Sequence, residues 1–282
     1  MAVRTLDKWN ISIGDGHPLL VIAGLNVIED LELARRTAQH LKKVCVELGL
    51  PYVFKASFDK ANRSSIHSYR GPGLEKGLEI LRAIKAEFDV PICTDLHTED
   101  QAEPVAEVAD VVQIPAFLGR QTDLVVAAAR ATHARGGWLH QKKSQNMAPW
   151  DARYMVDKVR EAVGGAEISV LCERGTTFGY NNLVVDMLAI GEMHKLGVPV
   201  TIDATHAVQL PGADPRTQGA STGGRREGVP TIAKAAIAAG ADGVFLEFHP
   251  NPDDALCDGP SALPLAGAGD LLRSLKAIHA VR

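Results

Sequence analysis

The sequence predicts an α/β fold, a single (β/α)8 TIM barrel with a short N-terminal β-hairpin at residues 1–18 that covers the barrel floor. Three observations predict it. The 282 residues are close to the roughly 250 that one such barrel needs. Short apolar, β-branched runs alternate with longer amphipathic or alanine-rich stretches, as in a parallel sheet covered by helices. No segment has the composition of a linker, so we expect one catalytic domain over residues 1–282.

The predicted barrel strands follow one another at intervals that leave room for crossover helices. They are residues 19–26, 52–59, 91–97, 111–117, 138–143, 168–175, 199–206 and 243–250. The helical stretches between them include residues 30–48, 73–88, 123–134 and 227–240. Ahead of the first strand, two short alternating runs lie around the turn residues Gly14, Asp15 and Gly16, which predicts the hairpin. The connections 60–73 and 207–225 are too long for simple turns, and long βα loops commonly carry function.

Composition argues against several classes of protein. The 30 Lys and Arg against 34 Asp and Glu give a net charge of -4, so no overall positive field attracts nucleic acid or an anionic membrane. Neither a signal-peptide pattern nor a run of about 18 apolar residues occurs, so we expect a cytoplasmic protein without a membrane partner. The four cysteines form no C-x-x-C pair, which favours a reducing compartment.

Polar residues stand at the carboxyl ends of all eight predicted strands, although a buried parallel strand is normally apolar throughout. They are Asn26, Lys55, Asp95 with His97, Gln113, Lys142 with Lys143, Glu173 with Arg174, Asp203 with His206, and Glu247 with His249. A single residue of this kind is usually only a structural hydrogen-bonding group. Active sites of (β/α)8 barrels are assembled at this end, so eight such strand ends predict an active site.

Cations are frequent among these residues and in the loop that follows the second strand. They are Lys55, Lys60, Arg63, Lys142 and Arg174. Like charges at that density repel one another unless an anion compensates them, and Arg and Lys are the usual groups that bind phosphate and carboxylate. The pattern predicts a small polyanionic ligand with more than one phosphate. The alternative is a set of solvated rim charges paired with nearby carboxylates.

The loop after the second strand adds neutral donors to these cations. Asn62, Arg63 and Ser64 supply an amide, a guanidinium and a hydroxyl within three residues. Such a mixed set suits a sugar phosphate better than a bare inorganic ion. The alternative is a turn that Asn and Ser stabilise by local hydrogen bonds.

His206, Glu247 and Asp258 combine one imidazole with two carboxylates near the predicted mouth. Such a set holds a divalent ion firmly only with a fourth ligand. The facing position in the first strand is Asn26, and a neutral amide is a weak ligand for transition metals. We therefore expect no metal, and assign hydrogen bonding and proton transfer to the trio.

Motifs along the chain resemble, in order, those of the 3-deoxy-D-manno-octulosonate 8-phosphate synthases. The similarity runs from residue 19 to residue 265 and so covers nearly the whole chain. The motifs are KASFDKANRSS (55–65), DLH (95–97), QIPAFLGRQTDL (113–124), KKSQ (142–145), ERGTTFGYNNLVVDM (173–187), DATHAVQLPGA (203–213), GGRRE (223–227) and HPNPDDALCDGPSALPL (249–265).

This resemblance implies condensation of phosphoenolpyruvate with D-arabinose 5-phosphate and water, with release of inorganic phosphate, for lipopolysaccharide synthesis. Phosphoenolpyruvate would be held by Lys60, Lys142, Arg174 and the backbone near Ala116; we add the strand-end residues Lys55 and Gln113. Arabinose 5-phosphate would be held by Asn62, Arg63, Ser64 and, across a subunit interface of a homotetramer, Arg120; we add Asp95. The candidate catalytic residues are Asn26, Lys60, His206, Glu247 and Asp258. No cofactor is expected.

The family has metal-dependent and metal-independent members, and the resemblance implies the second class. Metal-dependent members carry cysteine at the position of Asn26, and this chain also reads CDGPS at residues 257–261, as metal-independent members do. In the predicted fifth strand the family usually has Asn-Val-Lys-Lys, followed by Gln-Phe. This chain departs from that pattern at His140, where the family has Asn, and at Asn146, although Lys142 and Lys143 match it. These departures bear on local packing and fine specificity.

Two alternatives remain open. One is a 3-deoxy-D-arabino-heptulosonate 7-phosphate synthase, which uses erythrose 4-phosphate and a metal and has Lys-Pro-Arg-Thr-Ser where this chain has residues 60–64. The other is a catalytically silent barrel that senses sugar phosphates, against which the intact Lys60, His206 and Asp258 argue.

Overall fold

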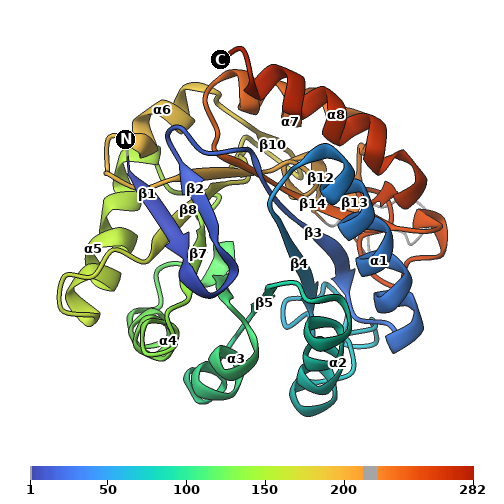
Figure 1. The fold of residues 1–282 in the computed structure, drawn as a ribbon, viewed down its shortest axis with the longest axis horizontal. Helices are drawn as coiled ribbons and strands as arrows, with labels where there is room; N and C mark the ends of the chain where they lie inside the picture. Colours follow the sequence, from blue (N-terminus) through green and yellow to red (C-terminus); the bar gives the residue numbers. More distant parts are fainter. Residues whose placement is uncertain (1, 212–221) are drawn as a thin grey trace.

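The computed structural model describes residues 2–211 and 222–282, and Figure 1 shows their barrel. In these residues eight parallel strands close into a ring, because β14 pairs with both β3 and β11. Around the ring, strand order follows the chain. The barrel strands are β3 (Leu20–Val27), β4 (Tyr52–Ser57), β5 (Ile92–Asp95), β6 (Val111–Ile114), β7 (Trp138–Lys142), β8 (Ser169–Glu173), β11 (Val200–Asp203) and β14 (Gly243–His249). The predicted (β/α)8 barrel is confirmed.

Helices of the described chain surround the strands, as Figure 1 shows. They are α1 (Leu31–Leu48), α2 (Leu74–Phe88), α3 (Ala102–Val108), α4 (Thr122–His133), α5 (Arg153–Ala162), α6 (Leu188–His194), α7 (Val229–Ala238) and α8 (Ala268–His279). Local sequence sets the bounds of α1. The Asp30 carboxylate accepts a hydrogen bond from the backbone N–H of Leu33, and Gly49 ends the helix in a left-handed conformation with φ of 63°. None of the helices in the described ranges is long and apolar enough to cross a membrane.

The N-terminal hairpin is present, but its turn does not lie where the sequence predicted. The strands are β1 (Val3–Leu6) and β2 (Ile11–Gly14), and the turn is a short 3-10 helix, η1 (Asp7–Trp9). Asn10 closes this turn with φ of 50°, a left-handed conformation that Asn adopts more readily than most residues. A turn is also present at Gly14–Gly16, where the His17 N–H donates to the backbone oxygen of Gly14 at 3.2 Å, but it leads the chain from β2 toward the barrel. The prediction that this turn joins the two hairpin strands was wrong.

The hairpin covers the floor of the barrel with apolar side chains. Leu6 and Ile13 pack into one cluster with side chains from the first halves of the barrel strands. These are Leu20, Ile22, Val53, Cys93, Val111, Trp138, Val170 and Phe245. Polar contacts fasten the hairpin from outside, since Trp9 Nε1 donates to Asp110 Oδ1 at 2.7 Å.

Above the floor, the inward-facing side chains become polar or charged within one or two inward positions along each strand. Side chains alternate between the two faces of a strand, so every second residue faces the interior. On β7, Trp138 belongs to the floor cluster, and His140 and Lys142 follow it inward. On β14, Phe245 belongs to the floor cluster and Glu247 follows it. The charged layer thus rests directly on the apolar one.

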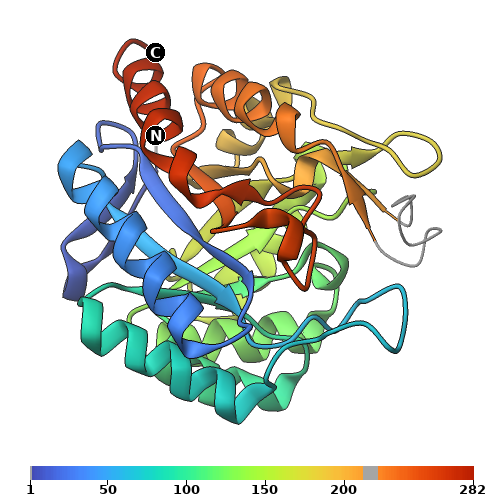
Figure 2. The ribbon, with the colours of Figure 1, turned by 90° about the vertical axis from the view of Figure 1, so that its right-hand side faces the viewer.

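Loops at the carboxyl end of the barrel carry short strands and extend beyond the ring. The loop 60–73 and the hairpin of β9 and β10 project from the same end of the molecule (Figure 2). The predicted long connection 207–225 contains the hairpin of β12 and β13, and its residues 212–221 lie outside the described part of the chain. The short strands are β9 (Thr176–Thr177), β10 (Leu183–Val184), β12 (Gln209–Leu210), β13 (Gly223–Gly224) and β15 (Leu263–Pro264).

Candidate active site

A cavity of about 370 Å³ lies at the carboxyl ends of the barrel strands. Its walls come from strand ends β5 to β11 and from the loops that follow β4, β6, β11 and β14. Most residues predicted as the site line it. These are Lys60, Asn62, Arg63, Ser64, Asp95, Gln113, Ala116, Lys142, Arg174, His206 and Asp258. The structure therefore brings together residues that are up to about 200 positions apart in the sequence.

Four predicted residues are not among those that line this cavity in the described part of the chain. Lys55 is fully buried below it, where Nζ donates to Glu247 Oε1 at 2.6 Å and to the backbone oxygen of Asn26 at 3.1 Å. Asn26 and Glu247 therefore form a layer beneath the cavity together with Lys55. Arg120 is exposed on the chain between β6 and α4, away from this layer.

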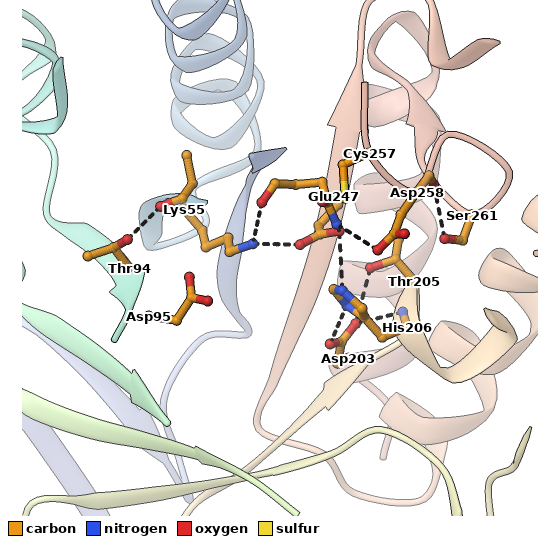
Figure 3. Close-up of polar contacts among 12 residues, drawn as sticks. Lys55, Thr94, Asp95, Asp203, Thr205, His206, Glu247, Cys257, Asp258 and Ser261 are labelled. Carbon is orange, nitrogen blue, oxygen red and sulfur yellow. Dashed lines mark hydrogen bonds and ion pairs between the residues drawn. The ribbon is translucent and has the colours of Figure 1, made fainter. Parts of the chain in front are cut away.

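The layer beneath the cavity is centred on the side-chain amide of Asn26. Its Nδ2 donates to Glu247 Oε2 and, at 3.3 Å, to Asp258 Oδ2, so the amide group bridges the two carboxylates. His206 Nε2 lies 3.5 Å from Glu247 Oε2 on the other side (Figure 3). Within the described residues, no cluster of three or more His, Cys, Asp or Glu side chains has the arrangement of a metal site.

Asp203 organises a second polar group beside the first. Its Oδ2 accepts from Lys142 Nζ at 2.6 Å and lies 2.7 Å from His206 Nδ1, as Figure 3 shows for the histidine. Its Oδ1 accepts from the Thr205 hydroxyl and from the backbone N–H of His206. Burial alone would raise the pKa of Asp203, but His206 and Lys142 hold it well below its usual value. Asp203 is therefore ionised at neutral pH and fixes both partners.

The remaining buried charges are stabilised in the same way. Burial disfavours the ionised form of Glu247, yet His206 and Lys55 lower its pKa. For Lys60, burial acts to lower the pKa, but the carboxylates of Glu247 and Asp95 raise it above its ordinary value. Lys60 thus enters the cavity as a firmly protonated ammonium group.

Arg174 places a guanidinium group with unused donors in the cavity wall. Its side chain is buried, and Nη2 donates to Gln209 Oε1 at 3.1 Å. Nε and Nη1 are buried and have no hydrogen-bond partner among the described residues. Buried donors without partners cost free energy, and a bound anion would remove that cost.

The backbone that carries Arg174 is held by an ion pair outside the cavity. Glu173 Oε1 accepts from the backbone N–H groups of Arg174 and Gly175 at 2.9 and 2.6 Å. Lys143 Nζ lies 3.7 Å from the same oxygen and also donates to Thr176 Oγ1. Although Lys142 and Lys143 are adjacent in the sequence, only Lys142 lines this cavity in the described part of the chain, and Lys143 holds the loop.

Several lining residues were not selected from the sequence as site residues. His97 Nε2 lies 3.1 Å from Asp95 Oδ2, and its position at a strand end was a signal that could have placed it in the site. Gln209 connects two walls, because it accepts from Arg174 and donates to Asp258 Oδ2 at 2.8 Å. The sequence around Gln209 does not mark it as a site residue, since it is a neutral residue in a loop and not at a predicted strand end. Cys257 lines the cavity beside Arg63, whose Nη1 contacts its sulfur.

The two departures from the family pattern lie in different environments. His140 is fully buried inside the barrel, below Lys142. Asn146 is exposed in the turn that follows β7. Only the first therefore lies close enough to affect the charged layer.

Comparisons with known proteins agree with the geometry. The model of the DAHP synthetase I family matches residues 2–279. A protein of Desulfosudis oleivorans is 54% identical over 271 residues, which are 96% of this chain and 94% of that protein. Relatives from Vibrio atlanticus and Trichlorobacter lovleyi are 52% and 50% identical, each over 99% of this chain and over 95% and 98% of their own. All three are named 2-dehydro-3-deoxyphosphooctonate aldolase, another name for the synthases that the motifs resemble. The chain therefore belongs to the DAHP synthetase I family and, within it, to the 2-dehydro-3-deoxyphosphooctonate aldolases.

Proposed function

We propose that this protein condenses phosphoenolpyruvate with D-arabinose 5-phosphate and water to give 3-deoxy-D-manno-octulosonate 8-phosphate and inorganic phosphate, for lipopolysaccharide synthesis. The observation that carries the proposal is the set of cations around one cavity: Lys60, Arg63, Lys142 and Arg174. Two of the donors of Arg174 are buried without a partner in the described residues. Such a site suits two phosphorylated reactants better than neutral ones.

Phosphoenolpyruvate occupies the part of the cavity near β6, β7 and β8. Arg174 and Lys142 bind its phosphate and carboxylate, and Lys60 contributes a third positive charge. The amide of Gln113 and the backbone at Ala116 complete this side. Lys55 acts from below, because it neutralises Glu247 and so keeps the layer under the phosphate from repelling it.

Arabinose 5-phosphate lies against the loop after β4. Arg63, with Asn62 and Ser64, binds its phosphate, and in the structure Arg63 Nη1 lies 3.6 Å from Asp258 Oδ1. Asp95, whose pKa is held well below its usual value by His97 against the effect of burial, accepts hydrogen bonds from sugar hydroxyls. Arg120 reaches a neighbouring subunit's site.

The first step joins two carbons. C3 of phosphoenolpyruvate attacks the aldehyde carbon, and the aldehyde oxygen becomes an alkoxide as its double bond opens. Lys60 donates a proton to this oxygen. Its pKa is raised, but the alkoxide is a stronger base than the Lys60 amine and therefore takes the proton. The electron-poor C2 that remains is stabilised by the carboxylate of Asp258, which lines the cavity.

The second step adds water and releases phosphate. Water attacks C2 while Asn26, His206 and Asp258 orient it from below. Asn26 Oδ1 is buried and has no partner among the described residues, so it can accept one hydrogen bond from this water. Asp203 Oδ2 lies against Nδ1 of His206, so the other ring nitrogen, Nε2, takes the proton that the attacking water loses. The C2–O bond then breaks, phosphate leaves, and C2 becomes the ketone.

No metal enters this scheme. Two N–H bonds of the Asn26 amide point at Glu247 and Asp258, so the space between these carboxylates presents positive hydrogens and not lone pairs to a cation. A divalent ion there would require lone-pair donors. Activity that persists after exhaustive chelation would support this assignment, and activity that a divalent ion restores would contradict it.

We further propose a cytoplasmic homotetramer. Exposed apolar side chains support assembly: Phe117, Trp150, Tyr154 and Leu188 are each at least half exposed, and they lie on elements around α5 and α6. Large exposed apolar side chains that gather on one side often mark interfaces. Light scattering during size-exclusion chromatography measures the mass directly.

One assay tests the proposed activity against both alternatives. Purified protein is mixed with phosphoenolpyruvate and either arabinose 5-phosphate or erythrose 4-phosphate, and inorganic phosphate and product mass are followed. We expect phosphate and an eight-carbon product with arabinose 5-phosphate alone. A preference for erythrose 4-phosphate would identify a heptulosonate phosphate synthase. If neither sugar phosphate led to phosphate release, the protein would be a sensor.

A further inference from the structure

The aromatic ring of Phe245 belongs to the apolar floor cluster and contacts the charged layer above it. Lys142 Nζ is 3.9 Å from the ring centroid and Lys55 Nζ is 5.2 Å away. An ammonium group at such distances is attracted to the ring face. The ring therefore helps to determine where the Lys142 ammonium group lies, together with Asp203 at 2.6 Å.

His140 fixes this ring in place. Its imidazole stacks on Phe245 with centroids 5.9 Å apart and an angle of 10° between the planes. Nε2 lies 2.8 Å from Thr201 Oγ1, and that hydroxyl donates to the backbone oxygen of Leu171 at 3.3 Å. Since the hydroxyl hydrogen is already used, Thr201 accepts a hydrogen bond from Nε2–H of His140. One tautomer and one ring orientation follow.

The imidazole is uncharged in this position. Burial, together with the positive charge of the nearby Lys142, lowers the pKa of His140 to about 3. A neutral ring can stack on Phe245 without repelling the two ammonium groups over the same ring. Charge on His140 would instead oppose Lys142.

A role in packing alone does not account for His140. Its Nδ1 is buried and has no partner among the described residues, which costs free energy that an apolar side chain would not. Nor does His140 touch the reactants, since it is not among the cavity-lining residues of the described chain. In the described residues it acts on the site through the Phe245 ring, through the charges above it and through Thr201 on β11.

We infer that His140 is a positioning residue for phosphoenolpyruvate binding, because it holds the Phe245 ring that sets the position of Lys142. This inference rests on the proposed function, in which Lys142 binds phosphoenolpyruvate. The family usually has asparagine at this position. The histidine of this chain therefore places an aromatic stack where its relatives have a small amide.

The test compares phosphoenolpyruvate binding among variants of the stack. Three of these are His140→Leu, which removes ring and hydrogen bond, His140→Phe, which keeps the ring, and His140→Asn, which is the family's residue and should fold readily. Calorimetry with phosphoenolpyruvate alone gives Kd. We expect Kd to rise about tenfold in His140→Leu and about threefold in the other two, while the KM for arabinose 5-phosphate changes less than twofold.

Three further variants separate positioning from a general loss of structure. Phe245→Leu should raise Kd by as much as His140→Leu, and the double variant should be no worse than either, because both act through one ring. Trp138→Phe, one inward step below on β7, should lower the melting temperature and leave Kd unchanged. Unchanged Kd in all His140 variants, additive effects, or a parallel rise in both KM values would overturn the inference.

Failure of the inference is distinguishable from failure of the proposed function. Wild-type protein is first assayed for turnover of phosphoenolpyruvate with arabinose 5-phosphate. If it has none, the function is wrong. If it turns over and the His140 variants bind phosphoenolpyruvate as wild type does, only the positioning role is wrong.

Discussion

The floor of the barrel and the charged layer at its mouth are built from the same strands and are both buried, yet their chemistry is opposite. At the floor, Ile13 and Val53 are fully buried among apolar neighbours. Two residues further along β4, Lys55 is equally buried but is charged and paired with Glu247. Burial of apolar area stabilises the fold, whereas burial of charge costs desolvation that the partner only offsets.

The difference indicates that stability and function are separated along the strand axis. The floor stabilises the barrel and, among the described residues, contributes no side chain to the lining of the cavity. The mouth contributes the groups that bind anions, and its buried donors are incompletely satisfied, as at Arg174. Changes at the mouth should therefore affect turnover most and stability least. Changes at the floor should do the reverse, except at Phe245, whose ring contacts Lys142.

The largest expected effect is loss of turnover when a cation of the mouth is removed. Lys60→Met and Arg174→Met should each lower kcat/KM by at least about 10³-fold, because each removes a charge that binds phosphate or stabilises the transition state. Steady-state assays of phosphate release measure it. Lys43→Met, on the exposed face of α1, is the matched control. Near-normal turnover in both variants would remove the basis for the site.

At the floor, the largest effect should be on stability. Ile13→Ala removes a fully buried side chain of the hairpin and should lower the free energy of unfolding by about 3 kcal/mol, the usual cost of such a cavity. Urea unfolding measures it, and kcat/KM at 25 °C should stay within about twofold of wild type. Val3→Ala, at an exposed position of β1, should change little. A large loss of activity in the folded Ile13 variant would break the separation of floor and mouth.

Asn26→Cys should change which ligand the mouth accepts. The substitution replaces an N–H donor between Glu247 and Asp258 with a thiolate, and with His206 it supplies a set that suits a divalent transition metal. Elemental analysis after dialysis should find about one metal ion per chain in the variant and none in wild type. Asn26→Ser, which adds no thiolate, is the control. A variant that remains metal-free would mean that these four side chains cannot converge on one ion.

The sequence was sufficient to predict the barrel because its signals are local and repeated. Each strand is a short apolar run, and each strand end carries a polar group. The hairpin turn was misplaced because Gly14 and Gly16 are stronger turn residues than Asn10, and the left-handed conformation of Asn10 is visible only in the structure.

The site was predictable as a set of strand-end residues but not as a network. Lys55 and Lys142 look alike in sequence, and only packing places one under the cavity and the other in its wall. Lys143 follows Lys142 in the chain but points to Glu173, because adjacent residues of an extended strand face opposite sides. Gln209 joins the walls through contacts between distant segments, for which local sequence gives no sign.

The smallest predicted effect concerns the boundary between the two layers, where His140 lies neutral. Its pKa is about 3 in the folded protein and about 6.5 in an unfolded chain. Between these values the unfolded state binds a proton that the folded state does not, so stability must fall as pH falls. The slope contributed by this one group approaches about 1.4 kcal/mol per pH unit below pH 6.

Comparison of wild type with His140→Asn isolates this contribution. Asp203 and Glu247 have lowered pKa values, so the stability they add is present above about pH 4 and is lost as pH falls below it, in both proteins alike. Urea unfolding at pH 5.0, 5.5, 6.0 and 7.5 should therefore show a steeper acid decline in wild type, and a constant difference above pH 7. Equal slopes would mean that His140 takes up a proton in the folded state. A charged imidazole over Phe245 would then repel Lys142, and the first charge above the apolar floor would be His140 and not Lys142.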